Sequence, residues 1–264
     1  MPPPAISREL RSSRATENTG YSCGSLTEVF LERMTWPEVG AAIAAGKRRA
    51  IICAASSEQH GPHLPEATDA LLGEEYARRL AIRLGDALVA PVIRPGCSEH
   101  HMTFPGSLTI SADLMMAIID SYIESLKRHG FESFVVMSSH GGNYPVLARW
   151  AKRNPRDDCL VISDLNVFQP AFDALRPFGR TDTAGPHAEV LETSMMLATH
   201  PHLVHMERAE PGFEGEMPLQ VLLERGMRGV SANGIIGNPV GATAEMGEAV
   251  LEALVESLAR HLRE

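Results

Sequence analysis

The sequence has little of what marks several large classes of protein. None of its apolar runs approaches the roughly 18–20 residues of a membrane span, and its N-terminus lacks the apolar core of a signal peptide. Basic residues are outnumbered, 24 to 33, and the net charge of −9 argues against nucleic acid or an anionic membrane as the main partner. The four cysteines never pair at CxxC spacing, so we expect free thiols in a cytoplasmic protein: Cys23, Cys53, Cys97 and Cys159.

The composition is that of one compact globular domain. Hydrophobic residues make up 44% of the 264 residues and charged residues 22%. A chain of this length can bury a large core without a structural metal, so any metal is expected to serve chemistry. Residues 1–25 are rich in Pro, Ser, Arg and Thr and predict a flexible arm, which leaves 26–264 as one domain.

Apolar runs and amphipathic segments alternate along this domain. Thr35 and Glu38 have capping-box spacing and predict a first helix that ends near Gly46. Strands are predicted at 50–55, 87–92, 133–137 and 159–164, and helices at 69–84, 112–129, 144–153, 189–199 and 243–262. This order indicates an α/β fold with a mainly parallel sheet and helices on both faces. Segments 169–186 and 205–234 are expected to be loops that carry a short helix and cover a site.

Polar residues gather directly after the predicted strands. Glu58, His60 and Asp69 follow the first strand, and His100 and His101 follow the second. The third strand is followed by a loop that carries His140, Gly141, Gly142 and Asn143. Ligands of open α/β sheets bind at the carboxyl ends of the strands, so these loops are expected to converge on one crevice.

The residue types in these loops suit a divalent transition metal. Imidazole and carboxylate together favour Zn, Mn or Fe. Asp69 begins a predicted helix, where its carboxylate can bridge two cations. The two glycines allow backbone to approach a metal or a substrate, and Asn143 can brace the loop or donate to a substrate carbonyl. Taken singly, His140 could cap its loop, and Glu192, in the helix predicted at 189–199, could be a solvated helix residue. The gathering of such residues at the carboxyl ends of the strands favours a metal site.

Five motifs, in this order, resemble the creatininase (creatinine amidohydrolase) family from about Leu26 to the C-terminus. They are Ser-Glu58-Gln-His60-Gly-Pro-His-Leu-Pro with Asp69, Phe104-Pro-Gly-Ser, His140-Gly-Gly-Asn, His187-Ala-x-x-x-Glu192-Thr-Ser, and a closing Gly-Ile-Ile-Gly-Asn-Pro segment. The resemblance implies a three-layer αβα sandwich, assembled as a homohexamer. It also implies two divalent metal ions, with zinc in the first place and manganese or iron as alternatives.

The resemblance further implies roles for individual residues. One metal is expected to be held by Glu58, Asp69 and His140, and the other by His60, Asp69 and Glu192. A hydroxide between the two metals attacks the carbonyl of a small cyclic or linear amide, and His187 or Glu189 gives a proton to the leaving nitrogen. The bond that is hydrolysed is expected to be a C–N bond other than an ordinary peptide bond. Substrate contacts are expected from Ser98, His101, Phe104, Gly141, Gly142 and Asn143.

Departures from creatininase itself shift the expected substrate. Gly141 and Gly142 stand where creatininase has tyrosine and glutamate. Creatininase also carries tryptophans that close over creatinine, whereas the only tryptophans of this sequence are Trp36 and Trp150. Creatinine is therefore disfavoured as the substrate. Glu189 replaces a usual glycine and could bind an amine-bearing substrate or point away. A biosynthetic peptidase or formamide deformylase using the same centre stays open as an alternative, as does a metal-binding oligomeric scaffold without turnover.

Overall fold

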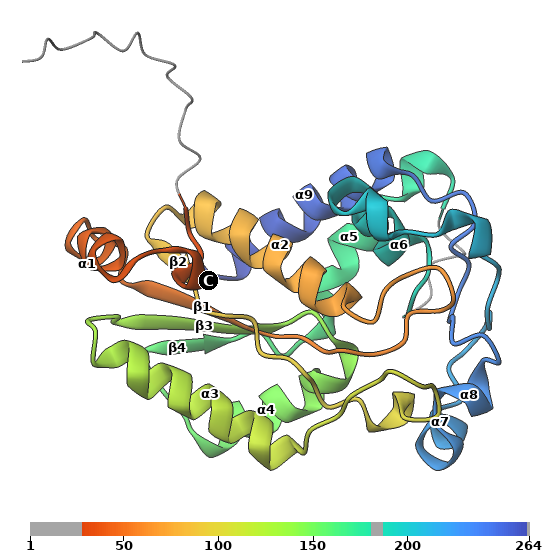
Figure 1. Ribbon diagram of the computed structural model, residues 1–264, viewed down its shortest axis with the longest axis horizontal. Helices are drawn as coiled ribbons and strands as arrows, with labels where there is room; N and C mark the ends of the chain where they lie inside the picture. Colours follow the sequence, from red (N-terminus) through yellow and green to blue (C-terminus); the bar gives the residue numbers. More distant parts are fainter. Residues whose placement is uncertain (1–27, 181–186, 263–264) are drawn as a thin grey trace, which may run out of the picture.

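The computed structural model describes residues 28–180 and 187–262, which form a parallel sheet between two layers of helices (Figure 1). The predicted arm at residues 1–25 lies outside this range. The strands are β1 (Arg49–Ala54), β2 (Ala87–Val89), β3 (Ser133–Ser138) and β4 (Cys159–Val161). The helices are α1 (Trp36–Ala44), α2 (Thr68–Leu84), α3 (Ala112–Lys127), α4 (Tyr144–Arg153), α5 (Gln169–Asp173), α6 (Val190–Thr199), α7 (Leu219–Arg225), α8 (Met227–Val230) and α9 (Ala244–His261).

The strand order is β2-β1-β3-β4, and every neighbouring pair is parallel. β1 and β3 pair along their whole length, from Arg49 opposite Ser133 to Ala54 opposite Ser138. Helices α2, α5, α6 and α9 cover one face of the sheet, and α3 and α4 cover the other (Figure 1). The parallel sheet with helices on both faces that the alternating pattern predicted is therefore confirmed, as is the three-layer αβα sandwich that the resemblance implied.

Local signals fix the ends of most helices. The capping box between Thr35 and Glu38 is formed at the start of α1, and Ser111 caps α3 by accepting a hydrogen bond from the Leu114 N–H. Gly85 ends α2 in the left-handed conformation, with φ at 79°. Thr243 caps α9 through the Met246 N–H.

Two strands are shorter than predicted. β2 ends at Val89 rather than Val92, since Pro91 has no N–H to donate to a sheet. β4 ends at Val161 rather than Asp164. The Asp164 side chain instead caps a 3-10 turn, Leu165–Phe168, by accepting a hydrogen bond from the Asn166 N–H.

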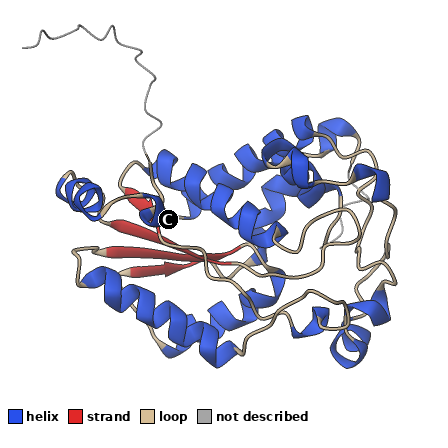
Figure 2. Cartoon of the chain, in the orientation of Figure 1, coloured by secondary structure: helices blue, strands red, loops and turns tan. Residues whose placement is uncertain are grey.

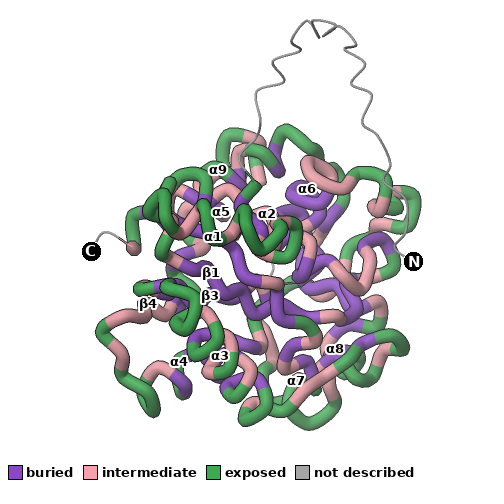
Figure 3. Tube along the Cα trace, turned by 60° about the vertical axis from the view of Figure 1, so that its left-hand side comes forward, coloured by how far each residue is buried: buried purple, intermediate pink, exposed green. Residues whose placement is uncertain are grey.

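Alternate residues of β1 fill two separate cores. Ile51 and Cys53 face the layer of α2, α6 and α9, whereas Ile52 faces α3, α4 and the buried Trp150. Burial is accordingly greatest along β1 and β3, and the outer faces of the helices are exposed (Figure 3). None of the described helices is both long and apolar enough to cross a bilayer.

The loops that follow the strands gather at one end of the sheet (Figure 2). The two segments that were expected to be loops with a short helix, 169–186 and 205–234, are mainly irregular where the structure describes them. Segment 169–186 begins with α5, and its residues 181–186 lie outside the described part. Segment 205–234 carries the short helices α7 and α8. Cys53, Cys97 and Cys159 are free thiols, as expected.

Candidate metal centre

Five predicted ligands meet at the carboxyl end of the sheet. Glu58 and His60 lie on the loop after β1, His140 follows β3, and Asp69 and Glu192 lie in the first turns of α2 and α6. The first four are at most 3% exposed. So many buried polar groups are unfavourable unless each has a partner, because burial removes them from water.

The five side chains form two donor sets that share one residue. Glu58, Asp69 and His140 form one set, and His60, Asp69 and Glu192 form the other, each with its ligand atoms within 4.8 Å of one another. His140 Nδ1 lies 3.2 Å from Asp69 Oδ2, and His60 Nε2 lies 3.4 Å from Asp69 Oδ1. The two carboxylate oxygens of Asp69 therefore face different histidines, as a bridging ligand requires.

Three atoms at the centre of this cluster have no hydrogen-bond partner among the described residues. They are Glu58 Oε1, His60 Nε2 and Asp69 Oδ2, all shielded from solvent. Glu58 Oε1 lies 3.1 Å from His140 Nδ1, but without hydrogen-bond geometry. An unsatisfied buried polar atom costs about 1–3 kcal/mol, so the arrangement fits divalent cations that these atoms would bind.

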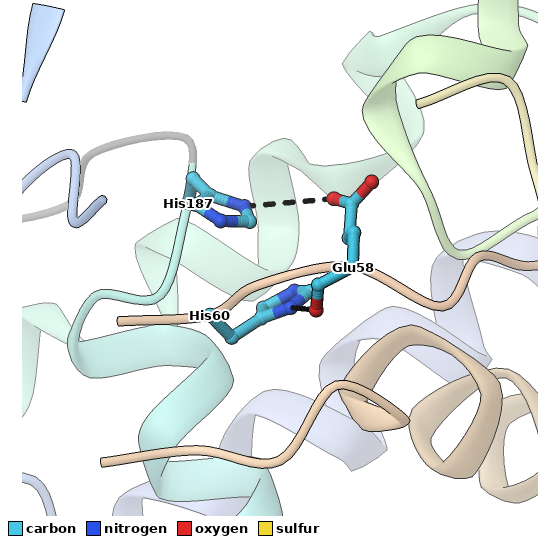
Figure 4. Close-up of side chains that lie close together, drawn as sticks. All are labelled: Glu58, His60 and His187. Carbon is cyan, nitrogen blue, oxygen red and sulfur yellow. Dashed lines mark hydrogen bonds and ion pairs between the residues drawn. The ribbon is translucent and has the colours of Figure 1, made fainter. Parts of the chain in front are cut away.

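Backbone carbonyls orient both histidines toward the cluster. His60 Nδ1 lies 3.0 Å from the Glu58 carbonyl oxygen (Figure 4), and His140 Nε2 lies 3.3 Å from the Cys97 carbonyl oxygen. Because a carbonyl only accepts, these nitrogens carry the hydrogens. The lone pairs of His60 Nε2 and His140 Nδ1 are thereby directed at the cluster, in the manner usual for metal-binding histidines.

The carboxylates hold protons on these histidines when no metal is present. Burial alone would lower the pKa of His60, but Asp69, with Glu192 and Glu58, raises it to about 10. Burial likewise opposes the charge of His140, yet Glu58 and Asp69 raise its pKa well above the usual value. Burial, reinforced by Asp69, raises the pKa of Glu192 to about 7. The cluster thus has an excess of negative charge. Protons balance this charge when no metal is bound, and divalent cations can take their place.

His187 lies beside the cluster with one nitrogen free to face it. Its Nε2 lies 2.7 Å from the Gln59 carbonyl oxygen and so carries a hydrogen, while Nδ1 lies 3.9 Å from Glu58 Oε1 (Figure 4). Burial, with the charge of His60, lowers the pKa of His187 to about 3. The neighbouring Ala188 has a positive φ of 56°, and its N–H donates to Glu192. Such strain in a non-glycine residue is typical of functional sites.

Gln59 is a site residue that the motifs did not single out. Its side-chain nitrogen lies 3.0 Å from His101 Nδ1 and 3.2 Å from the Gly234 carbonyl oxygen. His101 Nδ1 then accepts, so the hydrogen is on Nε2, which lies 3.2 Å from Glu58 Oε1 without hydrogen-bond geometry. Gln59 stands between two ligand positions in the sequence, but no spacing rule marks it, since its partners come from distant loops.

The predicted substrate residues fall into different places. The Asn143 side chain is committed to backbone, since it accepts from the Cys97 N–H and donates to the carbonyls of Ala54 and Ala55. It therefore braces the loops, which is one of the two roles expected for it. Ser98 is buried, and its hydroxyl is hydrogen-bonded to the Ser56 hydroxyl.

Gly142 and Phe104 also have structural roles. A Cβ on Gly142 would lie 2.4 Å from His140 Nε2, so only glycine fits against this histidine. The Arg228 guanidinium carbon lies 4.2 Å from the centroid of the Phe104 ring. Phe104 is not among the residues that line the cavity next to Glu192, described below. His101 instead contacts Glu58, which places it next to the cluster.

A cavity of about 220 Å³ opens beside the cluster. Of the predicted residues, Gly141, Glu189 and Glu192 line it. Glu189 caps α6 by accepting a hydrogen bond from the Leu191 N–H, and burial, with the charge of Glu192, raises its pKa well above the usual value. Much of the remaining lining was not predicted and is aromatic: Tyr76, Tyr144, Phe168 and Phe172. Phe168 and Phe172 lie in or next to a segment without clear periodicity.

Comparison with known proteins decides the family. A family model described as "Creatininase: Creatinine amidohydrolase" matches residues 32–262. The chain belongs to the creatininase family. It is accordingly a metal-dependent hydrolase of the creatinine amidohydrolase type, as the motifs indicated.

Relatives in the creatininase family have several activities. A creatinine amidohydrolase of Pseudomonas putida is 29% identical over 252 residues, which cover 89% of this chain and 96% of the relative. A mycofactocin precursor peptide peptidase of Mycobacterium tuberculosis is 31% identical over 233 residues, with 80% and 83% covered. A solved manganese form of creatininase has a TM-score of 0.72 at 28% identity and covers 89% of this chain and 98% of its own. A mutant creatininase of Zn–Zn type gives the same score.

Proposed function

We propose that Glu58, Asp69 and His140 hold one divalent cation, that His60, Asp69 and Glu192 hold a second, and that this centre hydrolyses a C–N bond of a small cyclic or linear amide. The observation that carries the proposal is that both donor sets share Asp69, whose two carboxylate oxygens face His60 and His140. Buried atoms of this cluster lack hydrogen-bond partners among the described residues. The zinc and manganese forms of related creatininases support these two metals, and iron stays an alternative.

The chain's own residues supply orientation and proton transfer. Divalent cations bound by these residues would supply a Lewis acid for the substrate carbonyl and an activated water. His187 Nδ1 carries a lone pair toward the cluster, so it can take a proton and deliver it to the leaving nitrogen. Glu189 is the weaker candidate for this step, because its carboxylate already accepts the Leu191 N–H at the start of α6.

Metal counting combined with a hydrolysis screen tests the proposal. Elemental analysis is expected to find about two transition metals per chain. A chelator-treated sample should lose turnover across cyclic amides, hydantoins, formamides and short peptides, and added zinc or manganese should restore it. Full turnover by a verified metal-free sample would refute the proposal, and a metal-loaded protein without any turnover would favour the scaffold alternative.

A peptidase is the second candidate function. The peptide peptidase of Mycobacterium tuberculosis is about as similar to this chain, at 31% identity over 233 residues, as the creatinine amidohydrolase, at 29% identity over 252 residues. The same centre would serve either reaction. Faster hydrolysis of short peptides than of isolated amides in the screen would favour this candidate.

We further infer that the chain acts as a homohexamer in the cytoplasm. The family resemblance supports the hexamer, and α7 offers Leu219 and Leu223, 60% and 75% exposed, as apolar surface for contact with another copy. Light scattering of the purified protein would give the mass of the assembly, and a monomer would contradict the inference.

A further inference from the structure

The cavity beside the cluster is walled by aromatic rings from separate elements. Tyr76 comes from α2, Tyr144 from α4, Phe168 from the turn after β4, and Phe172 from α5. The rings of Tyr144 and Phe168 meet edge to face at 6.1 Å and 73°. At about 220 Å³ the cavity is smaller than the roughly 300–1,000 Å³ pockets of drug-sized ligands. It therefore suits one ring-sized substituent next to the reacting bond.

Few polar groups in this wall are free for a ligand. The Tyr144 hydroxyl donates to the Ser138 carbonyl, and the Ser139 hydroxyl donates to the Asp69 carbonyl. The Tyr76 hydroxyl, in contrast, makes no hydrogen bond to any residue in the ranges 28–180 and 187–262. Together with the carboxylate of Glu189, it is left to meet a substrate group that can donate a hydrogen bond.

The wall offers no cationic partner to a ligand. Glu189 and Glu192 contribute carboxyl groups, and the described lining includes no Lys, Arg or His. A carboxylate or phosphate on the substrate would lose its water here without gaining a positively charged partner, whereas a neutral or cationic N–H group would find hydrogen-bond acceptors.

Building on the function proposed above, we propose that the substrate is a neutral or cationic amide with an aromatic or other planar apolar substituent. This substituent fills the space between Phe168, Phe172 and Tyr144, and an N–H of the substrate faces Glu189. An anionic group next to the amide is rejected. The apolar wall thus sets which amide reaches the metal centre, while the cluster sets the reaction.

Three amides that share the reacting group test this proposal. Phenylalaninamide, alaninamide and the α-amide of aspartate differ only in the side chain, so any metal contact by their amino group is common to all three. With manganese-loaded protein, kcat/KM for phenylalaninamide should exceed that for alaninamide by about tenfold or more, because a buried ring adds apolar contact. The aspartate amide should fall below alaninamide. Calorimetry with metal-free protein should give the same order of affinity.

Variants with a matched control locate the effect. Phe168→Ala should reduce the phenylalaninamide-to-alaninamide ratio severalfold. Phe213→Ala, at a separate surface hollow beside Gly212 and Asn233, should leave the ratio unchanged.

The outcomes separate this proposal from the function on which it rests. Turnover of the amides without preference for the aromatic one, or a ratio insensitive to Phe168→Ala, would overturn the substrate class alone. Absence of turnover with every amide, in protein that contains both metals, would overturn the proposed function together with it. If Phe168→Ala lowers the melting temperature strongly, Phe168→Leu gives the same comparison with less loss of packing.

Discussion

The metal cluster and the aromatic cavity meet at Glu192 but are built differently. The cluster takes its donors from loops directly after β1 and β3 and from the first turns of α2 and α6. The cavity takes its rings from the middle of α2, the first residue of α4, the 3-10 turn after β4, and α5. The cluster is thus anchored to the sheet by buried backbone, whereas part of the cavity wall, including the 57% exposed Leu165, lies at the surface.

This difference predicts which changes alter chemistry and which alter selectivity. Substitutions in the cluster should remove metal and rate together, because the buried donors have no substitute. Substitutions in the cavity should leave metal content intact and change the order of substrates. The largest effects are expected from substitutions in the cluster.

Glu192→Gln should remove one of two metals and lower kcat by roughly a thousandfold, because loss of one source of transition-state stabilisation costs about 10²–10³. Elemental analysis and a turnover assay measure both. Glu224→Gln, on the surface of α7, is the matched control and should change neither. Retention of two metals by Glu192→Gln would remove it from the ligand set.

His187→Gln should keep both metals and lower kcat by about 10²–10³, since general acid–base groups contribute about 10²–10⁴. The loss should be greatest for amides with poor leaving groups, because those need the proton most. His202→Gln, in the short turn after α6, serves as control. Equal losses for good and poor leaving groups would argue against proton delivery by His187.

Gln59→Leu should reduce kcat by about 10–100-fold, the range for residues that orient metal-site side chains. The variant removes the amide that donates to His101, while the main-chain carbonyl that holds His187 remains. Gln59→Glu offers oxygen in place of that donor and should not rescue the rate. Unchanged kcat in Gln59→Leu would show that His101 needs no orientation.

Metal affinity should increase with pH. The raised pKa of His60, about 10, means that its proton stabilises the metal-free fold fully below 6.5 and is lost as pH rises through 10. A cation needs the neutral ring and must displace this proton, so affinity should rise about tenfold per pH unit for each proton released. Calorimetry in buffers of different ionisation enthalpy counts these protons; uptake of protons on metal binding would contradict the sign.

Sequence predicted the fold and the cluster better than the cavity, for physical reasons. Strand ends and helix starts have local signals, so Asp69 and His140 could be placed at one edge of the sheet. Phe168 and Phe172 come from a stretch without a clear period, and nothing local tells which way their rings point. Asn143 and Gln59 depend on partners in distant loops, which only the folded chain brings together.

The most direct test of the shared carboxylate is the metal content of Asp69→Asn. Asn is nearly isosteric but carries no charge, so the variant should fold and yet bind neither metal, in contrast to Glu192→Gln, which should keep one. Elemental analysis of both variants, purified side by side with added manganese, makes the comparison. An Asp69→Asn protein that still holds about two metals per chain would contradict the bridging role of Asp69 on which the account rests.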